Sequence, residues 1–225
     1  VVPAGVDDTG QIAHDLGAQV FDETELLPDA GPVLGKGDAM WRGVSAARGD
    51  VVCFVDGDTT GFGEHFVVGP VGPILDGSAA LTKACFRRPF TTPSGEELQA
   101  GGGRVTELMA RPLLRALWPE LAGLRQPLAG EVAAMRSLLL ELPFSVGYAV
   151  ETAMLLDVYQ RCGADAIAEV DLDVRRNAHQ SLTALSNMAD EVLAAALSRV
   201  AGVQAVAAPV ERPPLRARRP LASAA

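Results

Sequence analysis

The residues best suited to chemistry are two aspartates, Asp56 and Asp58, that directly follow the apolar run VVCFV (51–55). In open α/β sheets, ligands bind beyond the carboxyl ends of the strands. Side chains two residues apart on an extended chain point to the same side. Two neighbouring carboxylates repel each other unless a proton or a cation lies between them. The triplet Asp56-Gly57-Asp58 therefore fits a divalent cation bridged to phosphate, and it fits an exposed Asp-Gly turn equally well.

Three known motifs share this triplet. An EF-hand loop needs a glutamate at its twelfth position, which is Val67 here, so that motif is excluded. The segment also resembles the nucleophile motif of haloacid-dehalogenase-type phosphatases, although that motif normally lies on the first strand of its fold, and here a predicted strand and helix precede it. The third possibility is the DxD motif of nucleotide-sugar glycosyltransferases, in which a metal holds the donor diphosphate.

Two further segments are suited to binding anions. Lys36 stands between Gly35 and Gly37, just before a predicted helix, in a pattern that is not a Walker loop. Three glycines, 101–103, precede Arg104 at the start of another predicted helix. Glycine lets the backbone approach a ligand closely, and a helix start attracts anions through its unpaired N–H groups. Arg104 adds a planar donor group suited to phosphate or carboxylate, so we expect an anion site here.

Apolar and amphipathic segments alternate along the chain and predict the elements that position these residues. Predicted helices cover residues 9–18, 37–49, 101–121, 148–163 and 181–200, and predicted strands cover 18–21, 50–58, 80–90 and 166–175. The long 101–121 helix is expected to bend at Pro112. This alternation predicts an α/β fold with a mostly parallel sheet. Residues 206–225, rich in proline, arginine and alanine, predict a disordered tail.

Composition limits the classes of function. The 225 residues are 48% hydrophobic, enough for a substantial core, and no uninterrupted apolar run is long enough to predict a transmembrane helix. The net charge of -9 argues against a nucleic-acid partner. Three widely spaced cysteines form no CxxC pair or disulfide framework, and this predicts a reducing, cytoplasmic location.

Beyond these motifs, residues 1–200 resemble the glucosyl-3-phosphoglycerate synthase family, an actinobacterial type of retaining glycosyltransferase. The resemblance lies in segments that occur in the family's order and spacing: GKGDAMWR (35–42), VVCFVDGD (51–58), FRRPF (86–90), GGGRVTELMARPLLRALWPEL (101–121), QPLAGEVAAMRSLLLELPF (126–144), GYAVETAMLLD (147–157) and ADAIAEVDLDVR (164–175).

The resemblance implies a GT-A fold, a Rossmann-like sheet flanked by helices, with UDP-glucose as donor, 3-phosphoglycerate as acceptor and Mg²⁺ or Mn²⁺ as cofactor. It assigns donor-binding roles to Lys36, Asp56, Gly57, Asp58, Leu128, Glu131 and Glu151, and acceptor-binding roles to Gly103, Arg104, Thr106 and Asn177. It makes Asp56, Asp58 and His179 the metal ligands, and Glu151 and Asp58 the catalytic residues. Asn177 and His179 stand in the reverse of the family's order.

The resemblance also divides the chain. Residues 1–100 are expected to bind the nucleotide sugar, without the family's first strand, and 101–205 to form a helical acceptor-side region. A homodimer is expected, and the apolar stretch DEVLAAALSRV (190–200) fits a dimer interface and the core of the chain equally well. The alternatives are a GDP-mannose-dependent mannosyl transferase, the phosphatase, and an inactive homologue that binds sugar nucleotides.

Overall fold

The computed structural model describes residues 1–3, 7–57, 59, 61–91, 97–98, 103–175, 180–203 and 208–218. Its centre is a four-stranded sheet with the strand order β1-β5-β2-β7. The strands are β1 (Val51–Phe54), β5 (Val132–Met135), β2 (Leu81–Arg87) and β7 (Ile167–Val174). Strands β2 and β7 pair in parallel, whereas β5 is antiparallel to both β1 and β2. Three strands therefore run in one direction and β5 runs against them.

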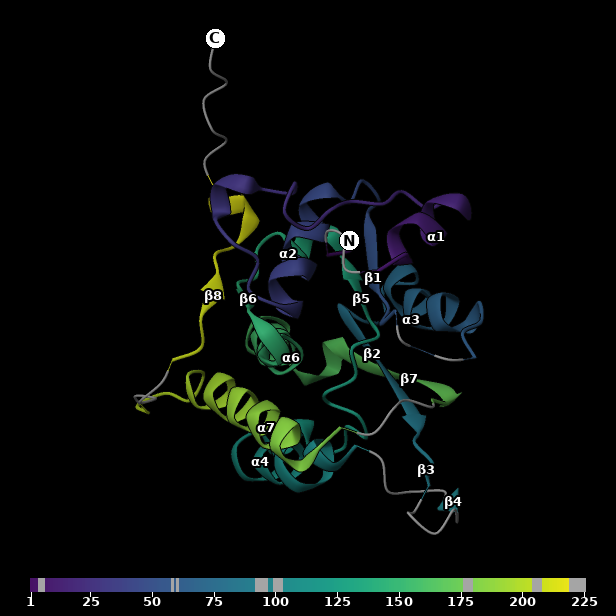
Figure 1. Cartoon of the computed structure of the whole chain (residues 1–225). Coiled ribbons are helices and arrows are strands. Elements are labelled where there is room, and N and C mark those ends of the chain that lie inside the picture. Colours follow the sequence, from purple (N-terminus) through teal and green to yellow (C-terminus); the bar gives the residue numbers. More distant parts are fainter. Residues whose placement is uncertain are drawn as a thin grey trace.

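Helices cover both faces of this sheet (Figure 1). The α-helices are α1 (Thr9–Asp15), α2 (Lys36–Ala46), α3 (His65–Leu75), α4 (Arg111–Leu117), α5 (Arg136–Leu139), α6 (Val150–Cys162) and α7 (Leu182–Leu197). A π-helical turn, η2 (Thr106–Ala110), precedes α4, and short 3₁₀ turns cover Pro28–Ala30, Pro119–Leu121, Gly147–Ala149, Ala164–Ala166 and Leu215–Ala217. Helix α3 packs on all four strands from one side, and α6 packs on the other.

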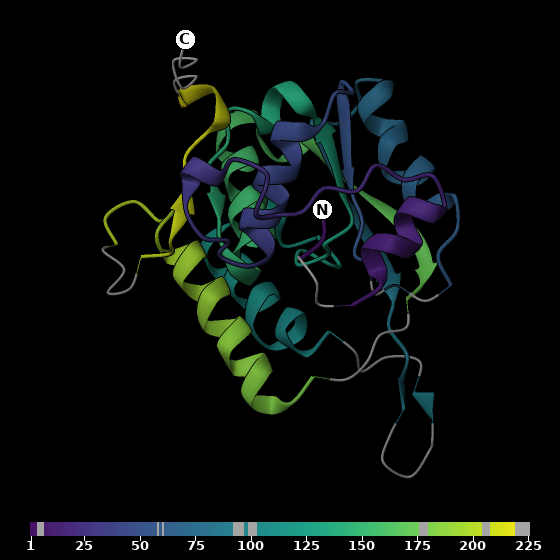
Figure 2. The same cartoon turned by 45° about the horizontal axis from the view of Figure 1, so that its top comes forward.

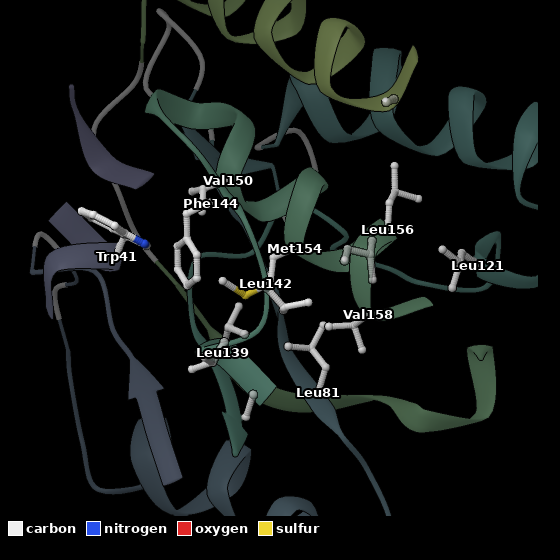
Figure 3. Close-up of a cluster of buried hydrophobic side chains, with 14 of the residues drawn as sticks. Trp41, Leu81, Leu121, Leu139, Leu142, Phe144, Val150, Met154, Leu156 and Val158 are labelled. Atoms are coloured by element: carbon white, nitrogen blue, oxygen red, sulfur yellow. The ribbon is translucent and has the colours of Figure 1, made fainter. Parts of the chain in front are cut away.

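The largest core cluster lies on the α6 side of the sheet. Figure 3 shows side chains of β2, α6 and the 139–144 segment gathered there, with Trp41 at one end of the cluster and Leu121 at the other. Alternation along β2 sends Leu81 into this cluster and Thr82 towards α3, where its hydroxyl donates to Pro70 O at 2.7 Å. Burial of these apolar side chains is the main stabilising contribution to the fold.

Helices α4 and α7 lie together below the sheet in Figure 1 and remain adjacent in Figure 2. The two small sheets are peripheral: β3 (Phe90–Thr91) pairs with β4 (Glu97–Leu98), and β6 (Phe144–Ser145) pairs with β8 (Glu211–Arg212). Within the described residues, no helix combines the length and the apolar character that crossing a bilayer requires.

The α/β class predicted from the sequence is confirmed, with differences in detail. The sheet is mixed, because β5, which the sequence did not single out as a strand, runs antiparallel to its neighbours. Residues 18–21 form no strand and lead only to an isolated bridge between Val2 and Asp22. Helix α3 was not predicted, because its two prolines and two glycines hide its helical pattern. The π turn lies immediately before the predicted bend at Pro112, which has no N–H to donate.

The prediction of a disordered tail is wrong for residues 208–218. Arg212 Nη2 lies 2.7 Å from Asp38 Oδ2, and Trp41 Nε1 donates to Pro213 O at 2.9 Å. Arg216 and Arg218 also form ion pairs, with Glu141 and Asp29 respectively. Ion pairs and a strand pairing hold this segment without the apolar periodicity that sequence reasoning looks for.

Candidate active site

A cleft of about 250 Å³ opens at one edge of the sheet. Residues next to the ends of all four strands line this cleft. Asp56, Arg88 and Arg175 follow the carboxyl ends of β1, β2 and β7. Because β5 is antiparallel, its amino-terminal end reaches the same edge, and Gly130 precedes it there. Strand β5 therefore brings backbone atoms to the cleft, whereas β1, β2 and β7 bring charged side chains to it. The lining residues are Lys36, Asp56, Arg88, Pro89, Gly103, Arg104, Val105, Thr106, Leu128, Gly130, Tyr148, Glu151, Arg175, Gln180, Leu185, Met188 and Val192.

Five charged side chains of alternating sign form a continuous chain along this cleft. Lys36 Nζ lies 2.6 Å from Glu151 Oε1 and 2.7 Å from Asp56 Oδ1. Arg175 Nη2 lies 3.0 Å from Asp56 Oδ2, and Arg175 Nη1 lies 2.7 Å from Glu131 Oε1. Glu131 is fully buried beneath the cleft, whereas Lys36 and Asp56 are partly accessible. The chain thus runs from the core to the cleft.

The protonation of these groups follows from burial and from their partners. Burial by itself would raise the pKa of Asp56, but Lys36 and Arg175 outweigh it and hold that pKa below its usual value. Burial likewise acts to lower the pKa of Lys36, and the charges of Glu151 and Asp56 together raise it. Burial raises the pKa of Glu131 despite its pairing with Arg175. Lys36 is therefore a permanent cation in the cleft at neutral pH.

An irregularity in β7 directs Arg175 into the site. The pairing of β2 with β7 shifts register between Cys85 and Arg87, and Asp173 has a φ of 67°. Such a bulge adds a residue to one strand and changes the side to which later side chains point. Arg175 N still donates to Arg87 O at 3.0 Å, so the strand end remains fixed. The Arg175 guanidinium also lies over the Phe86 ring, 5.3 Å from its centroid.

The segment 128–131 forms the wall beneath the Lys36–Asp56 ion pair. A Cβ placed on Gly130 would lie 2.6 Å from both Lys36 Nζ and Asp56 Oδ2, closer than real contacts allow. Only glycine lets the backbone approach the ion pair this closely. Leu128 lines the cleft beside it.

The opposite side of the cleft carries the predicted anion loop. Gly103 has a φ of 72°, a left-handed conformation that favours glycine, and its carbonyl accepts from Glu107 N at 3.0 Å. Arg104 Nη2 donates to Gln180 O at 2.8 Å, and Thr106 is buried next to it. Arg88, over the Phe86 ring, adds a second guanidinium to this side.

Helix α7 closes the cleft and fixes the start of α6. Glu191 Oε2 accepts from Tyr148 N at 2.6 Å, just before the first turn of α6, which carries Glu151. Tyr148 is 48% exposed and lines the cleft. The apolar stretch 190–200 is core on its inner face, with Val192, Ala195 and Ala196 buried within the chain.

The predicted site residues are brought together as far as the structure describes them. Those that line the one cleft are Lys36, Asp56, Gly103, Arg104, Thr106, Leu128 and Glu151, with Glu131 directly below. Gly57 follows Asp56 with open space around it. Asp58, Asn177 and His179 lie outside the described residues. Sequence reasoning missed Arg88, Gly130 and Arg175, and the only available signal was the position of each arginine near the carboxyl end of a predicted strand.

The predicted metal ligands have the chemistry that a hard divalent cation prefers, but the structure describes only part of them. Asp56 places carboxylate oxygens in the cleft, and such oxygens are the ligands that Mg²⁺ and Mn²⁺ prefer. Among the described residues, no three acidic, histidine or cysteine side chains gather closely enough to hold a metal. The other two predicted ligands, Asp58 and His179, lie outside the described residues.

A mixed α/β sheet with a charged cleft at the carboxyl ends of three of its strands is the arrangement expected of the GT-A fold of nucleotide-sugar glycosyltransferases, and the solved structures that match the chain show this fold. Mannosyl-3-phosphoglycerate synthase from Rubrobacter xylanophilus matches with a TM-score of 0.82 at 38% identity, covering 95% of this chain and 77% of that one. Glucosyl-3-phosphoglycerate synthase from Mycobacterium tuberculosis, in complex with Mn²⁺, UDP-glucose and phosphoglyceric acid, matches with a TM-score of 0.81 at 41% identity, covering 95% and 77%.

The chain belongs to the glucosyl-3-phosphoglycerate synthase family. The curated relative from Mycolicibacterium paratuberculosis is 46% identical over 196 residues, which are 86% of this chain and 60% of that protein. The chain therefore spans 60% to 66% of the length of the curated relatives with which it shares 42% to 46% identity. No protein-family model matches the chain.

Proposed function

We propose that this protein transfers glucose from UDP-glucose to the 2-hydroxyl of 3-phosphoglycerate, with retention at the anomeric carbon. The observation that carries this proposal is that the Lys36–Asp56–Glu151 charges and the Gly103–Arg104 loop line the same cleft. A reaction between two anionic substrates needs two anion-binding regions side by side, one for each. The named activity of the relatives supports the same reaction.

On the donor side, Lys36 presents an ammonium group to the diphosphate. Negative charge grows on the diphosphate as its bond to glucose breaks, so a fixed cation stabilises the transition state more than the bound donor. Glu151, held by Lys36 at 2.6 Å, lies where positive charge develops on the sugar ring, and it acts as electrostatic stabiliser or nucleophile. Leu128 and the Gly130 backbone form the wall of the sugar pocket.

On the acceptor side, Arg104, the Gly103 backbone and Thr106 hold the phosphate of 3-phosphoglycerate, with Asn177 as a further contact. Arg104 is already oriented by the Gln180 carbonyl, so less side-chain freedom is lost when the acceptor binds. Fixing the phosphate places the 2-hydroxyl against the donor sugar, and this proximity lowers the barrier to transfer.

A divalent cation, Mg²⁺ or Mn²⁺, is the proposed cofactor, with Asp56, Asp58 and His179 as ligands. When bound, it supplies a Lewis acid for the departing diphosphate. Relatives have been solved with Mn²⁺ and UDP-glucose. Independently of the ion, Lys36 and Arg175 keep Asp56 ionised and orient both of its oxygens.

The decisive experiment is a transfer assay with UDP-glucose, 3-phosphoglycerate and Mn²⁺, followed by identification of the product. Asp58→Ala is expected to abolish metal-dependent transfer and to leave the fold intact by circular dichroism. Arg104→Ala is expected to raise the KM for 3-phosphoglycerate and to leave the KM for UDP-glucose unchanged. Full activity of the Asp58 variant would remove the metal role, and an unchanged acceptor KM would remove the assignment of Arg104.

A second candidate is the transfer of mannose from GDP-mannose to the same acceptor. It is favoured by the structural match to a mannosyl-3-phosphoglycerate synthase, whose TM-score of 0.82 is similar to the value of 0.81 for a glucosyl-3-phosphoglycerate synthase. Assaying both donors with one preparation separates the two, because the ratio of kcat/KM values measures specificity directly. Turnover with neither donor, together with calorimetric binding of UDP, supports the inactive sugar-nucleotide-binding homologue. The phosphatase alternative gains no support from the comparisons.

A homodimer and a cytoplasmic location complete the proposal, and both rest on the family resemblance and on the cysteine pattern. The inner face of the stretch 190–200 is used within the chain, so a dimer would need another surface. Light scattering coupled to gel filtration measures the mass directly, and a mass of one chain at micromolar concentration rules out a stable dimer.

A further inference from the structure

The chain contains only two lysines, Lys36 and Lys83. Lys36 lines the cleft, whereas Lys83 lies on β2 beneath it and is only 1% exposed. Lysine is among the residues least often fully buried, because removing an ammonium group from water is costly unless polar partners compensate. A buried lysine in the middle of the central sheet therefore needs polar partners that compensate for its burial.

Lys83 holds the backbone of the 128–131 segment. Its Nζ donates to Ala129 O at 2.9 Å, one residue before Gly130, which abuts the Lys36–Asp56 ion pair. Leu128, on the other side of Ala129, lines the cleft. A small shift of the Ala129 carbonyl would thus move both the cleft wall and the backbone that supports the ion pair.

Lys83 also balances the buried charge at the site. Without it, the alternating chain by itself has three carboxylates and two cations, a surplus of one negative charge within that chain. With it, three cations face three carboxylates: Lys36, Lys83 and Arg175 against Asp56, Glu131 and Glu151. Glu131 and Glu151 both act electrostatically on Lys83.

We propose that Lys83 is a positioning residue for the donor side of the reaction, which fixes the 128–130 backbone through Ala129 O and offsets the negative charge beneath the donor diphosphate. This inference rests on the proposed transfer from a sugar nucleotide. Lys83 is below the cleft and touches no substrate, so it acts through Gly130, Lys36 and Asp56.

The test compares Lys83→Met with Thr82→Val. Methionine keeps the length and apolar stem of lysine and removes the charge and the hydrogen bond. Thr82 is an equally buried neighbour whose hydroxyl also donates to a backbone carbonyl, Pro70 O, but on the opposite face of the sheet under α3. Both variants lose one buried hydrogen bond and are expected to lose some stability. Only Lys83→Met is expected to affect the donor side.

Steady-state kinetics give the distinguishing result. For Lys83→Met we expect the KM for UDP-glucose to rise about ten-fold, the equivalent of one buried hydrogen bond, and the KM for 3-phosphoglycerate to change by less than about two-fold. For Thr82→Val we expect both values to stay within about two-fold of wild type. An unchanged donor KM in Lys83→Met, or an equal rise in Thr82→Val, overturns the inference. Absence of transfer in the wild-type protein is a failure of the proposed function instead.

A second measurement needs neither a folded Lys83 variant nor turnover. Labelling with ¹³C,¹⁵N-lysine gives signals from just two side chains, and Lys36→Met identifies which one belongs to Lys83. In the wild-type protein, saturating UDP is expected to shift the Lys83 signal, and 3-phosphoglycerate alone is expected to leave it in place. The inference is overturned if the Lys83 signal keeps its chemical shift when UDP is added while the Lys36 signal shifts.

Discussion

Lys36 Nζ lies 2.6 Å from Glu151 Oε1 and so joins the start of α2 to the start of α6 across the cleft. The same nitrogen binds Asp56 beyond β1 at 2.7 Å. We predict that Lys36→Met lowers kcat/KM about 100-fold, because it removes the cation facing the diphosphate and leaves two carboxylates close together without it. Steady-state kinetics with UDP-glucose measure this loss. A variant within about two-fold of wild type would contradict it.

Gly130→Ala tests the close approach of the 128–131 backbone to the ion pair. The new Cβ would meet Lys36 Nζ and Asp56 Oδ2 at 2.6 Å, so these side-chain ends must move apart. We expect activity to fall at least about ten-fold while the free energy of unfolding changes by less than about 1 kcal/mol, because flexible side-chain ends adjust more readily than backbone. Gly123→Ala is the control, since its Cβ would meet nothing within 4 Å. Equal activity in the two variants would contradict the prediction.

Arg175→Met tests the buried end of the charge chain. Arg175 and Glu131 are both almost fully buried, so removing the arginine leaves a carboxylate without this cation in the interior. We expect a loss of about 3 kcal/mol in the free energy of unfolding, measured with urea. Adding Glu131→Gln to Arg175→Met removes the stranded charge and should restore at least about 1 kcal/mol. A double variant less stable than the single one would show that the ion pair is not the cause.

Arg212→Ala tests the contact of the 208–218 segment with α2. Arg212 binds both oxygens of the fully buried Asp38, at 2.7 and 2.8 Å. We expect a loss of about 3 kcal/mol, because Asp38 is left with weaker compensation for its burial. Arg216→Ala breaks an exposed pair with Glu141 and should cost less than about 1 kcal/mol. Equal midpoints of thermal unfolding for the two variants would show that the Arg212–Asp38 contact stabilises the fold no more than the exposed Arg216–Glu141 pair does.

The pH dependence of stability tests the environment of Lys83. Burial lowers the pKa of Lys83 to about 8, although nearby carboxylates oppose this. Because the folded pKa is below the unfolded value, the unfolded chain binds more protons between these two pKa values, so stability gains from Lys83 as pH rises through this window. We expect wild type to gain about 2 kcal/mol over Lys83→Met between pH 7 and pH 9.5. The lysine NMR signal gives the pKa directly, and a value above about 10 would contradict the prediction.

The sequence by itself determined the α/β class, most of the helices, the three strands that run in one direction, and the residues Lys36, Asp56, Arg104 and Glu151 as parts of one site. The fold class, these elements and the residues Lys36, Asp56 and Arg104 follow from local signals: apolar periodicity, strand ends, and glycines next to charged residues. Such signals can be recognised without the tertiary structure, because each depends only on residues that are neighbours in the chain. Glu151 follows only from the resemblance to the family.

Only the tertiary structure decided which way β5 runs, that Gly130 lies against an ion pair, and that Arg175 and Lys83 are the buried cations beneath the cleft. Each of these depends on partners far away in sequence, such as Arg175 with Asp56 and Lys83 with Ala129. A charged residue in a strand gives no local sign of the partner that compensates its burial. That partner is fixed only when the sheet brings distant segments together, which is why the roles of Arg175 and Lys83 could not be predicted from composition or spacing.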